Sequence, residues 1–431
     1  MKSRDACWFA IAWIASGLFM SYRASAETLD WQAAVDQARK NNSQLTSARE
    51  SYEAARLRSN GGYAPFLPKL AGNLSYSRGN TGTARAGGEL VTGTDQIRDS
   101  YAATIDFDQN LFNGYSDAAA LREAKANEAQ QKANLDSTRA QVSFDLKSAF
   151  SGMKYAQDTT TLADAIVERR RDNMRLVELR FEGGRENKGS VLLSKAALTQ
   201  AHYEALQARQ NLRLAGRELA RILGQEGNEN LNIRGKVPLS SFNDEPDLRA
   251  LALDTPAYRQ ALAQTELADA RLGKARARFF PTLDLSGSIG RLDDRFFPEN
   301  ERWSVGLNIR IPLLRGGADY FASRSAARDL SAANAQQTGT AHEALVTLEE
   351  SRNNLLLAIK KIEVDSDFLK AAEVRAEIAR NRYNTGLLTF EDWDLIENDL
   401  IQRQKAVLQS ERDRVVAEGS WEKALGKGVI E

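Results

Sequence analysis

The sequence predicts a mostly helical protein that carries a small transmembrane β part at one end. Three observations lead to this fold class. Residues 116–182 and 318–384 are long runs without proline, rich in Ala, Glu, Gln, Lys, Arg and Leu, which favour helix. Four stretches of about ten residues alternate apolar with small or charged side chains, as transmembrane β-strands do. The order of these elements in the first half recurs in the second half.

The first 26 residues have the features of a secretory signal peptide. Lys2 and Arg4 precede a mostly apolar run over 7–20, and Ala24-Ser25-Ala26 is a typical cleavage site. Cys7 is the only cysteine and lies in this leader, so we expect no disulfide in the mature protein. The remaining chain has nearly equal numbers of basic and acidic residues, which argues against nucleic acid as a partner.

The rest of the chain is predicted to consist of two structural repeats. An offset of 202 residues aligns Arg180 with Arg382 and Gly184 with Gly386, and an upstream offset of 213 aligns Pro68 with Pro281. The offsets differ because the loop 78–99 is longer than its counterpart 291–301. We therefore divide the chain into a first repeat (27–225), an equatorial linker (226–246) and a second repeat (247–431).

Each repeat is expected to contain two strands, and these are placed at 66–77, 100–112, 280–290 and 302–313. The alternation is also compatible with a half-buried sheet in a soluble protein. Four strands are too few to close a barrel in one chain, so the transmembrane interpretation requires an oligomer.

The other segments are predicted to be helical. The runs 116–182 and 318–384 would each be roughly 100 Å long at the rise of an α-helix. Shorter helices are expected over 30–62, 189–223, 247–278 and 391–424. The two short helices of a repeat, stacked end to end, would match its long helix in length.

The segment "RFEGGRENKGSVLL" (180–193) superficially resembles a phosphate-binding loop. Such a loop needs a preceding strand and a lysine, whereas here a helix precedes it and Ser190 occupies the lysine position. We interpret Gly183-Gly184 as the point where the long helix ends, since glycine readily adopts the left-handed conformation. Ser190 is a residue type that can cap the following helix.

The chain resembles the TolC family of outer-membrane efflux proteins over nearly all of its predicted mature length. The resemblance rests on the order and duplication of "FLPKL" and "FFPTL", "LFNGY" and "IPLLRGG", two tips of the form R-[F/Y]-x-x-G, and "LG" at two helix ends. It implies a homotrimer with a 12-stranded β-barrel, four strands per subunit, and an α-helical barrel of long antiparallel helices in the periplasm of a Gram-negative bacterium. The function implied is an exit duct for tripartite efflux or type I secretion.

The resemblance also implies roles for residues at the helical tips. An acidic position of the family matches Asp392, with Asp394 close by, and both are candidates for the periplasmic constriction. Tyr383 matches an aromatic residue that ties the closed tip. Both aspartates also suit a helix N-terminus for reasons of capping and the helix dipole. A periplasmic adaptor, working with an inner-membrane pump, is expected to contact the tips at Gly184, Arg185, Gly386, Leu387 and Leu388.

Two other classes of function account less well for the sequence. An enzyme is disfavoured because the two histidines, His202 and His342, lie at non-equivalent positions and no nucleophile motif is present; no catalytic residue, cofactor or metal is expected. A soluble periplasmic coiled-coil adaptor or scaffold would account for the helices but leaves the duplicated strands unexplained.

Overall fold

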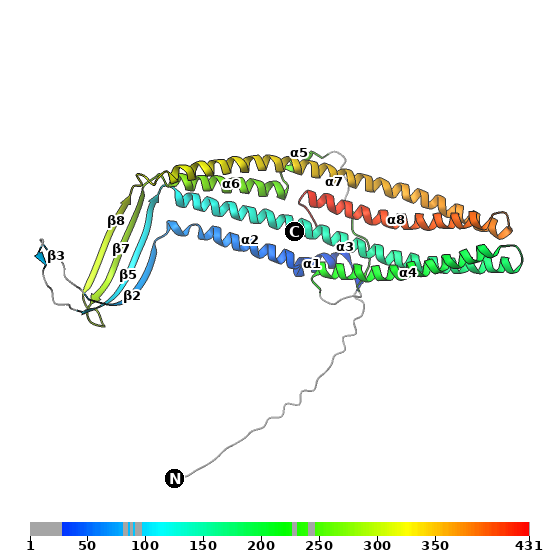
Figure 1. Cartoon of the computed structure of the whole chain (residues 1–431), viewed down its shortest axis with the longest axis horizontal. Helices are drawn as coiled ribbons and strands as arrows, with labels where there is room; N and C mark the ends of the chain where they lie inside the picture. Colours follow the sequence, from blue (N-terminus) through cyan, green and yellow to red (C-terminus); the bar gives the residue numbers. More distant parts are fainter. Residues whose placement is uncertain are drawn as a thin grey trace, which may run out of the picture.

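The computed structural model describes residues 28–80, 85–86, 89–90, 97–225, 231–239 and 246–430. The predicted signal peptide lies outside the described residues. A four-stranded antiparallel sheet forms one end of the molecule and helices form the remainder (Figure 1). The strands are β2 (Lys69–Asn80), β5 (Ile97–Asn113), β7 (Thr282–Asp293) and β8 (Glu301–Arg310), hydrogen-bonded in the order β2-β5-β7-β8. The two-residue strands β3 (Arg85–Ala86) and β4 (Glu89–Leu90) pair with each other in the β2–β5 connection.

Two helices run the full length of the helical part: α3 (Ser116–Glu182) and α7 (Ala318–Thr385). Beside α3 lie α2 (Ser43–Gly61) near the sheet and α4 (Lys188–Leu223) away from it. Beside α7, α6 (Pro256–Ala277) and α8 (Phe390–Ala424) are arranged in the same way (Figure 1). Within the described residues, no helix combines the length and the apolar character needed to cross a membrane.

The segment expected to be a single helix over 30–62 is divided in two, α1 (Trp31–Asn41) and α2, at Asn42. The Asn42 side chain accepts a hydrogen bond from Leu45 N at 3.0 Å, which caps α2, and donates to the Ile222 carbonyl at the end of α4 at 2.9 Å. Gly224 follows α4, and a Cβ there would lie 2.3 Å from the Asn41 carbonyl oxygen. The joint between α2 and α4 therefore depends on a capping amide and on a glycine.

The second repeat has an equivalent joint, which divides the expected helix 247–278 into α5 (Leu248–Ala252) and α6. Thr255 caps α6 by accepting from Tyr258 N at 3.3 Å, and Pro256 occupies the first helical position, where its missing N–H costs nothing. A Cβ on Gly426 would lie 2.1 Å from the Pro256 ring, so α6 and α8 abut closely. Asn42 and Thr255 are 213 residues apart, as are the other matched positions upstream of the loops.

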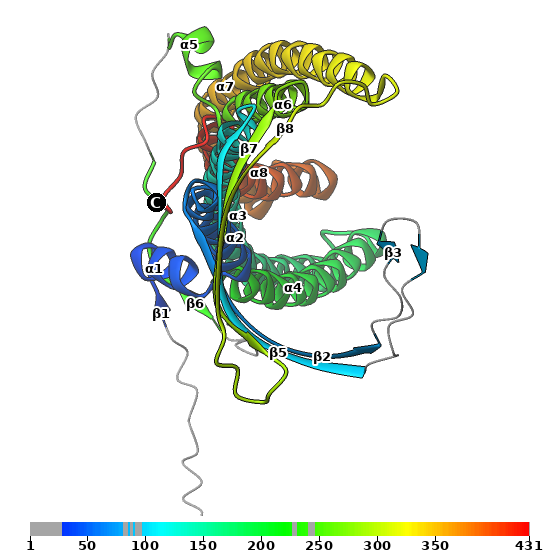
Figure 2. The same cartoon turned by 90° about the vertical axis from the view of Figure 1, so that its left-hand side faces the viewer.

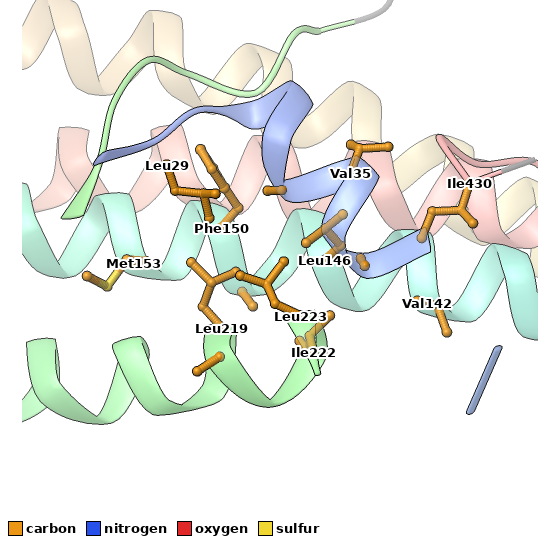
Figure 3. Packing of buried hydrophobic residues seen from close by; sticks show 14 of the residues in the cluster. Leu29, Val35, Val142, Leu146, Phe150, Met153, Leu219, Ile222, Leu223 and Ile430 are labelled. Carbon is orange, nitrogen blue, oxygen red and sulfur yellow. The ribbon is translucent and has the colours of Figure 1, made fainter. Parts of the chain in front are cut away.

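The largest hydrophobic cluster lies at the level of the joints, where α1, α3 and α4 meet (Figure 3). Leu146 and Phe150 of α3 pack there with Leu219 and Leu223 of α4. The chain enters this cluster through β1 (Thr28–Leu29), which pairs in parallel with β6 (Asn232–Ile233) of the equatorial linker, and ends in it at the buried Ile430. Both described ends of the chain are therefore anchored in this core.

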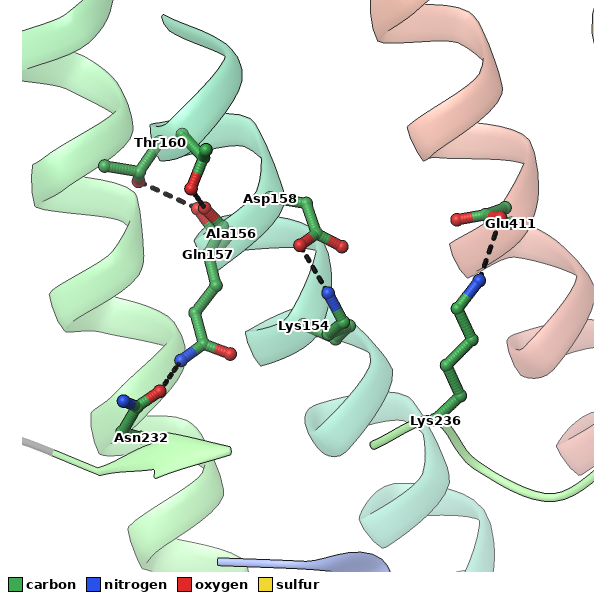
Figure 4. Close-up of polar contacts among 9 residues, drawn as sticks. Lys154, Ala156, Gln157, Asp158, Thr160, Asn232, Lys236 and Glu411 are labelled. Atoms are coloured by element: carbon green, nitrogen blue, oxygen red, sulfur yellow. Dashed lines mark hydrogen bonds and ion pairs between the residues drawn. The ribbon is translucent and has the colours of Figure 1, made fainter. Parts of the chain in front are cut away.

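Polar contacts hold the equatorial linker against the helices (Figure 4). Lys236 Nζ lies 3.2 Å from Glu411 Oε1 on α8, and Gln157 on α3 donates to Asn232. The linker thus crosses α3 and contacts α8, so it bridges the two repeats.

Candidate functional site

The end of the molecule remote from the sheet is formed by two tight connections between helices. Residues 183–187 connect α3 to α4, and residues 386–389 connect α7 to α8. They share one geometry. Gly184 and Gly386 are both left-handed, with φ of 68° and 82°, and the next residue donates back to an arginine carbonyl, Arg185 N to Arg180 O and Leu387 N to Arg382 O, each at 2.8 Å. The two repeats therefore have the same backbone conformation and hydrogen bonding at their tips.

The cap of α4 differs from the expectation. Asn187, not Ser190, is the N-cap, and its side chain accepts from Ser190 N at 2.9 Å. Ser190 lies inside the first turn with its hydroxyl buried. The correction follows from spacing: a cap accepts from the amide three residues later, and α4 begins at Lys188.

Tyr383 lies between the two tips and is completely buried. Its ring stacks on Trp393 of α8 with centroids 4.3 Å apart, and its hydroxyl donates to Glu186 Oε2, in the other tip, at 3.0 Å. The Arg180 guanidinium covers the ring at 4.5 Å and donates to the Tyr383 carbonyl. Burial, and then the hydrogen bond to Glu186, raise the pKa of the Tyr383 phenol well above its usual value.

Tyr383 therefore joins the α3–α4 hairpin to the α7–α8 hairpin through its ring, its hydroxyl and its backbone. This geometry suits the tether expected from the sequence. Whether the contact controls passage stays a prediction.

Asp392 is exposed in the first turn of α8. Its carboxylate accepts from Thr389 Oγ1 at 2.9 Å, and Thr389 Oγ1 accepts from Asp392 N at 3.2 Å. This pair of bonds starts the helix, as the capping interpretation requires. The carboxylate remains open to solvent, so the same residue is also available to face a pore. The role of Asp392 at a constriction stays a prediction.

Asp394 is turned towards the other hairpin. Its Oδ1 lies 2.8 Å from Arg170 Nη1 on α3, and its Oδ2 accepts from Asn398 at 2.9 Å. Arg170 is almost fully buried, so this ion pair is shielded from water on one side. Asp394 therefore links α8 to α3 in the single chain, and its predicted place at the constriction is untested.

The predicted adaptor-contact residues lie on the outer surface of the tips. Arg185 is exposed, and Leu387 is 77% exposed. Leu388 is half-buried and packs against the cluster of Val177, Tyr383 and Trp393. Leu387 is therefore accessible to a partner, and that partner remains a prediction.

The sequence analysis missed a series of buried polar links between helices, most of which join α3 to α8. Glu397 on α8 is buried and lies 3.2 Å from Arg380 on α7 and 3.9 Å from Arg169 on α3. Nearer the equator, buried Lys147 on α3 lies 3.3 Å from Glu418 and 2.7 Å from Glu422 on α8. The signal available was the presence of charged residues within otherwise helical, Ala-rich runs, but most of their partners lie in the other repeat.

The sheet carries a second candidate surface, which is apolar. Cross-strand pairs match apolar with apolar side chains: Leu70 opposite Phe107, Ile105 opposite Ile289, and Leu285 opposite Leu307. The other face matches polar pairs such as Asp284 opposite Asn308. The apolar face is exposed, for example 87% at Leu74 and 75% at Trp303. A strongly curved sheet (Figure 2) with such a face is typical of a strand array in contact with lipid.

Comparisons with known proteins agree with this architecture. The family model described as outer membrane efflux protein matches residues 34–225 and 248–427. The alkaline protease secretion protein AprF of Pseudomonas aeruginosa is 26% identical over 407 residues, covering 88% of this chain and 82% of that protein. The solvent efflux pump outer membrane protein SrpC of Pseudomonas putida is 24% identical over 413 residues, covering 91% and 84%.

A solved structure, the outer membrane protein VceC of Vibrio cholerae, has the same fold. It superposes with a TM-score of 0.82 at 23% identity and covers 92% of this chain and 96% of that chain. The long helices and the four antiparallel strands therefore form a known arrangement.

Proposed function

The chain belongs to the outer membrane efflux protein family, and from this premise we propose that three copies assemble into one exit duct through the outer membrane and the periplasm. As a member of that family it is an outer-membrane efflux channel of a Gram-negative bacterium, a conduit and not an enzyme. The soluble adaptor or scaffold considered as the alternative is set aside, because the family match spans both repeats.

The observation that carries the trimer proposal is the open sheet. β2 and β8 form its two edges, and within the described residues neither outer edge has a partner strand. An unpaired edge beside an exposed apolar face cannot persist in a bilayer, where every backbone polar group needs a partner. Pairing β8 of one copy with β2 of the next would satisfy the edges, and three copies would supply a 12-stranded barrel.

The helical part supports the same assembly. The 67 residues of α3 correspond to roughly 100 Å, and α7 carries exposed apolar residues on one face, such as Val346, Leu357 and Phe368. In a trimer these side chains would be covered by neighbouring copies. The helices would then surround a duct, with the tips at its periplasmic entrance.

We propose that the duct is passive and opens at the tips. The Tyr383 tether and the Asp394–Arg170 pair hold the two hairpins together in one copy. Three copies of Asp392 would gather negative charge at the entrance. A periplasmic adaptor and an inner-membrane pump would engage the tips around Leu387 and loosen these contacts.

The names of the relatives suggest two classes of cargo, secreted proteins and small molecules. One relative is named for secretion of a protease and another for solvent efflux. The duct proposed here would serve either tripartite efflux or type I secretion, with cargo selected by the pump.

The proposal is tested by native mass spectrometry of the full chain extracted from outer-membrane fractions, followed by reconstitution in planar bilayers. The expected result is a mass three times that of one processed chain and discrete ion-conducting events. A monomer, or recovery in the soluble periplasmic fraction alone, would refute the trimeric duct.

A further inference from the structure

The junction between the sheet and α3 contains a strained tyrosine. Tyr115 has φ of 69° and ψ of 14° and is the one non-glycine residue with positive φ among the described residues. A bulky side chain in the left-handed region is a genuine outlier. Such strain persists where the surroundings or a function require it.

The second repeat shows that the backbone, rather than the side chain, requires this conformation. The equivalent junction has Gly316 and Gly317, with φ of 60° and 81°, where the first repeat has Gly114 and Tyr115, with φ of 65° and 69°. Glycine would therefore satisfy the turn at position 115 without strain. The turn therefore does not explain why position 115 is a tyrosine.

Packing within the chain does not explain the tyrosine either. The Tyr115 side chain is 67% exposed. Its ring makes edge-to-face contacts with two aromatic rings, Phe112 with centroids 5.4 Å apart and Phe280 with centroids 6.5 Å apart. The ring therefore faces outward from an aromatic group at the helical end of the sheet.

This aromatic group continues the apolar face of the sheet. A register shift between Asn110 and Phe112 places Phe112 opposite Leu283, and Leu283 lies opposite Ile309 on the apolar side. Tyr115, in contact with Phe112, thus lies at the margin of the surface that the proposed function assigns to lipid.

A second aromatic group marks the other end of the same face, where Tyr76 and Tyr101 pack with centroids 4.9 Å apart. Tyr101 and Phe112 lie in one strand and are about 36 Å apart at about 3.3 Å per residue. A strand tilt of about 40° reduces this to about 28 Å along the membrane normal, close to the apolar band of about 25 Å in outer-membrane barrels.

We propose that Tyr115 is a membrane-interface anchor: its ring lies in the headgroup layer of the periplasmic leaflet and fixes the depth of the sheet in the bilayer. The ring suits that layer because its edge is apolar and its hydroxyl can remain hydrated. The proposal rests on the proposed function, since it requires the apolar sheet face to meet lipid.

Depth-dependent quenching tests the anchor directly. In full-length protein with Cys7→Ser, a bimane probe is attached at Tyr115→Cys, at Ile289→Cys in the middle of the apolar face, or at Leu57→Cys on exposed α2. The protein is reconstituted in phosphatidylcholine vesicles brominated at shallow or deep acyl positions. We expect the probe at 115 to be quenched several-fold more by shallow than by deep bromines, the probe at 289 mainly by deep bromines, and the probe at 57 by neither.

The outcomes separate this inference from the proposed function. If the probe at 289 is quenched by lipid and the probe at 115 responds only to aqueous iodide, or mainly to deep bromines, the anchor is refuted while the duct stands. If the probe at 289 is not quenched either, the lipid-facing sheet itself is refuted.

Substitution provides an independent test. Tyr115→Gly relieves the strain, so a purely structural tyrosine predicts an unchanged depth for the probe at 289 and equal or higher heat stability. The anchor predicts that the shallow-to-deep quenching ratio at 289 changes by about twofold or more in Tyr115→Gly and returns to the parent value in Tyr115→Trp, which restores an interfacial ring. An unchanged ratio in Tyr115→Gly would overturn the proposal.

Discussion

At the scale of single residues, the Tyr383 hydroxyl offers the most specific test of the predicted tether at the tips. Tyr383→Phe removes the donor to Glu186 but keeps the stack on Trp393. One hydrogen bond to a carboxylate contributes about 1.5–3 kcal/mol at most, so we expect the fold to survive and the tether to weaken. Single-channel recordings should show a several-fold higher open fraction. Tyr203→Phe, at an exposed tyrosine of α4, is the matched control, and equal open fractions in both variants would contradict the tether.

Asp392 carries the prediction about charge at the entrance. Three carboxylates facing one another across a narrow entrance would together bind a multivalent cation. Asp392→Asn should therefore weaken block of the channel by hexamminecobalt by about tenfold or more, equivalent to about 1.4 kcal/mol. Glu391→Gln, at the exposed neighbour, should leave the block intact. Unchanged block in Asp392→Asn would remove this residue from the constriction.

The sequence located Tyr383 and Asp392 but not their bonding partners. The family resemblance selected these positions, and their roles at the tips stay predictions. The bond between Tyr383 and Glu186 spans 197 residues, and the bond between Arg170 and Asp394 spans 224. Such contacts depend on how one hairpin docks on the other, which no local pattern encodes.

At the scale of elements, the joints between short helices are predicted to be points of stability. Asn42→Ala removes the cap of α2 and leaves the Ile222 carbonyl of α4 without its donor. We expect a loss of about 1–3 kcal/mol in the free energy of unfolding, seen as a lower midpoint of thermal unfolding by circular dichroism. Ser43→Ala, at the exposed next residue, should change the midpoint little. Equal effects of the two substitutions would contradict the proposed contribution of Asn42 to stability.

A salt bridge between elements predicts a dependence on pH. Glu204 on α4 lies 2.7 Å from Lys405 on α8. Partial burial raises the pKa of the Glu204 carboxyl, but hydrogen bonds from Lys405 and Gln200 outweigh burial and lower it below its ordinary value. A carboxyl with a lowered pKa stabilises the fold above its unfolded pKa of about 4.3, and this stabilisation is lost as pH falls through the folded pKa.

Glu204→Gln should therefore lower the thermal midpoint at neutral pH and flatten its fall below about pH 4.3. The contribution of a pair this exposed is below about 1 kcal/mol, so the comparison is made against Glu363→Gln, which removes an exposed pair within α7. Parallel pH profiles for Glu204→Gln and the parent protein would exclude the bridge as a source of acid sensitivity.

The long elements could be predicted because their signals are local. Proline-free runs defined α3 and α7, and alternation defined the four strands. The breaks at Asn42 and Thr255 could not be predicted in this way. Each depends on the end of a helix from elsewhere in the chain, α4 in one repeat and α8 in the other.

At the scale of the whole molecule, a single chain leaves surfaces exposed that are typical of an oligomer interface or of contact with lipid. It exposes an apolar sheet face, two unpaired strand edges among the described residues, and apolar side chains along its long helices. These features disagree with a lone soluble protein and agree with an assembly that closes on itself around a duct. The sequence indicated that an oligomer was required, because four strands cannot close a barrel.

The central claim, that three copies form one duct, is tested most directly by single-particle imaging of the full-length protein purified in detergent. The account predicts a particle with three-fold symmetry, a helical tube of roughly 100 Å and a short barrel at one end. A monomeric rod, or an assembly of different symmetry with the strand edges left open, would contradict it.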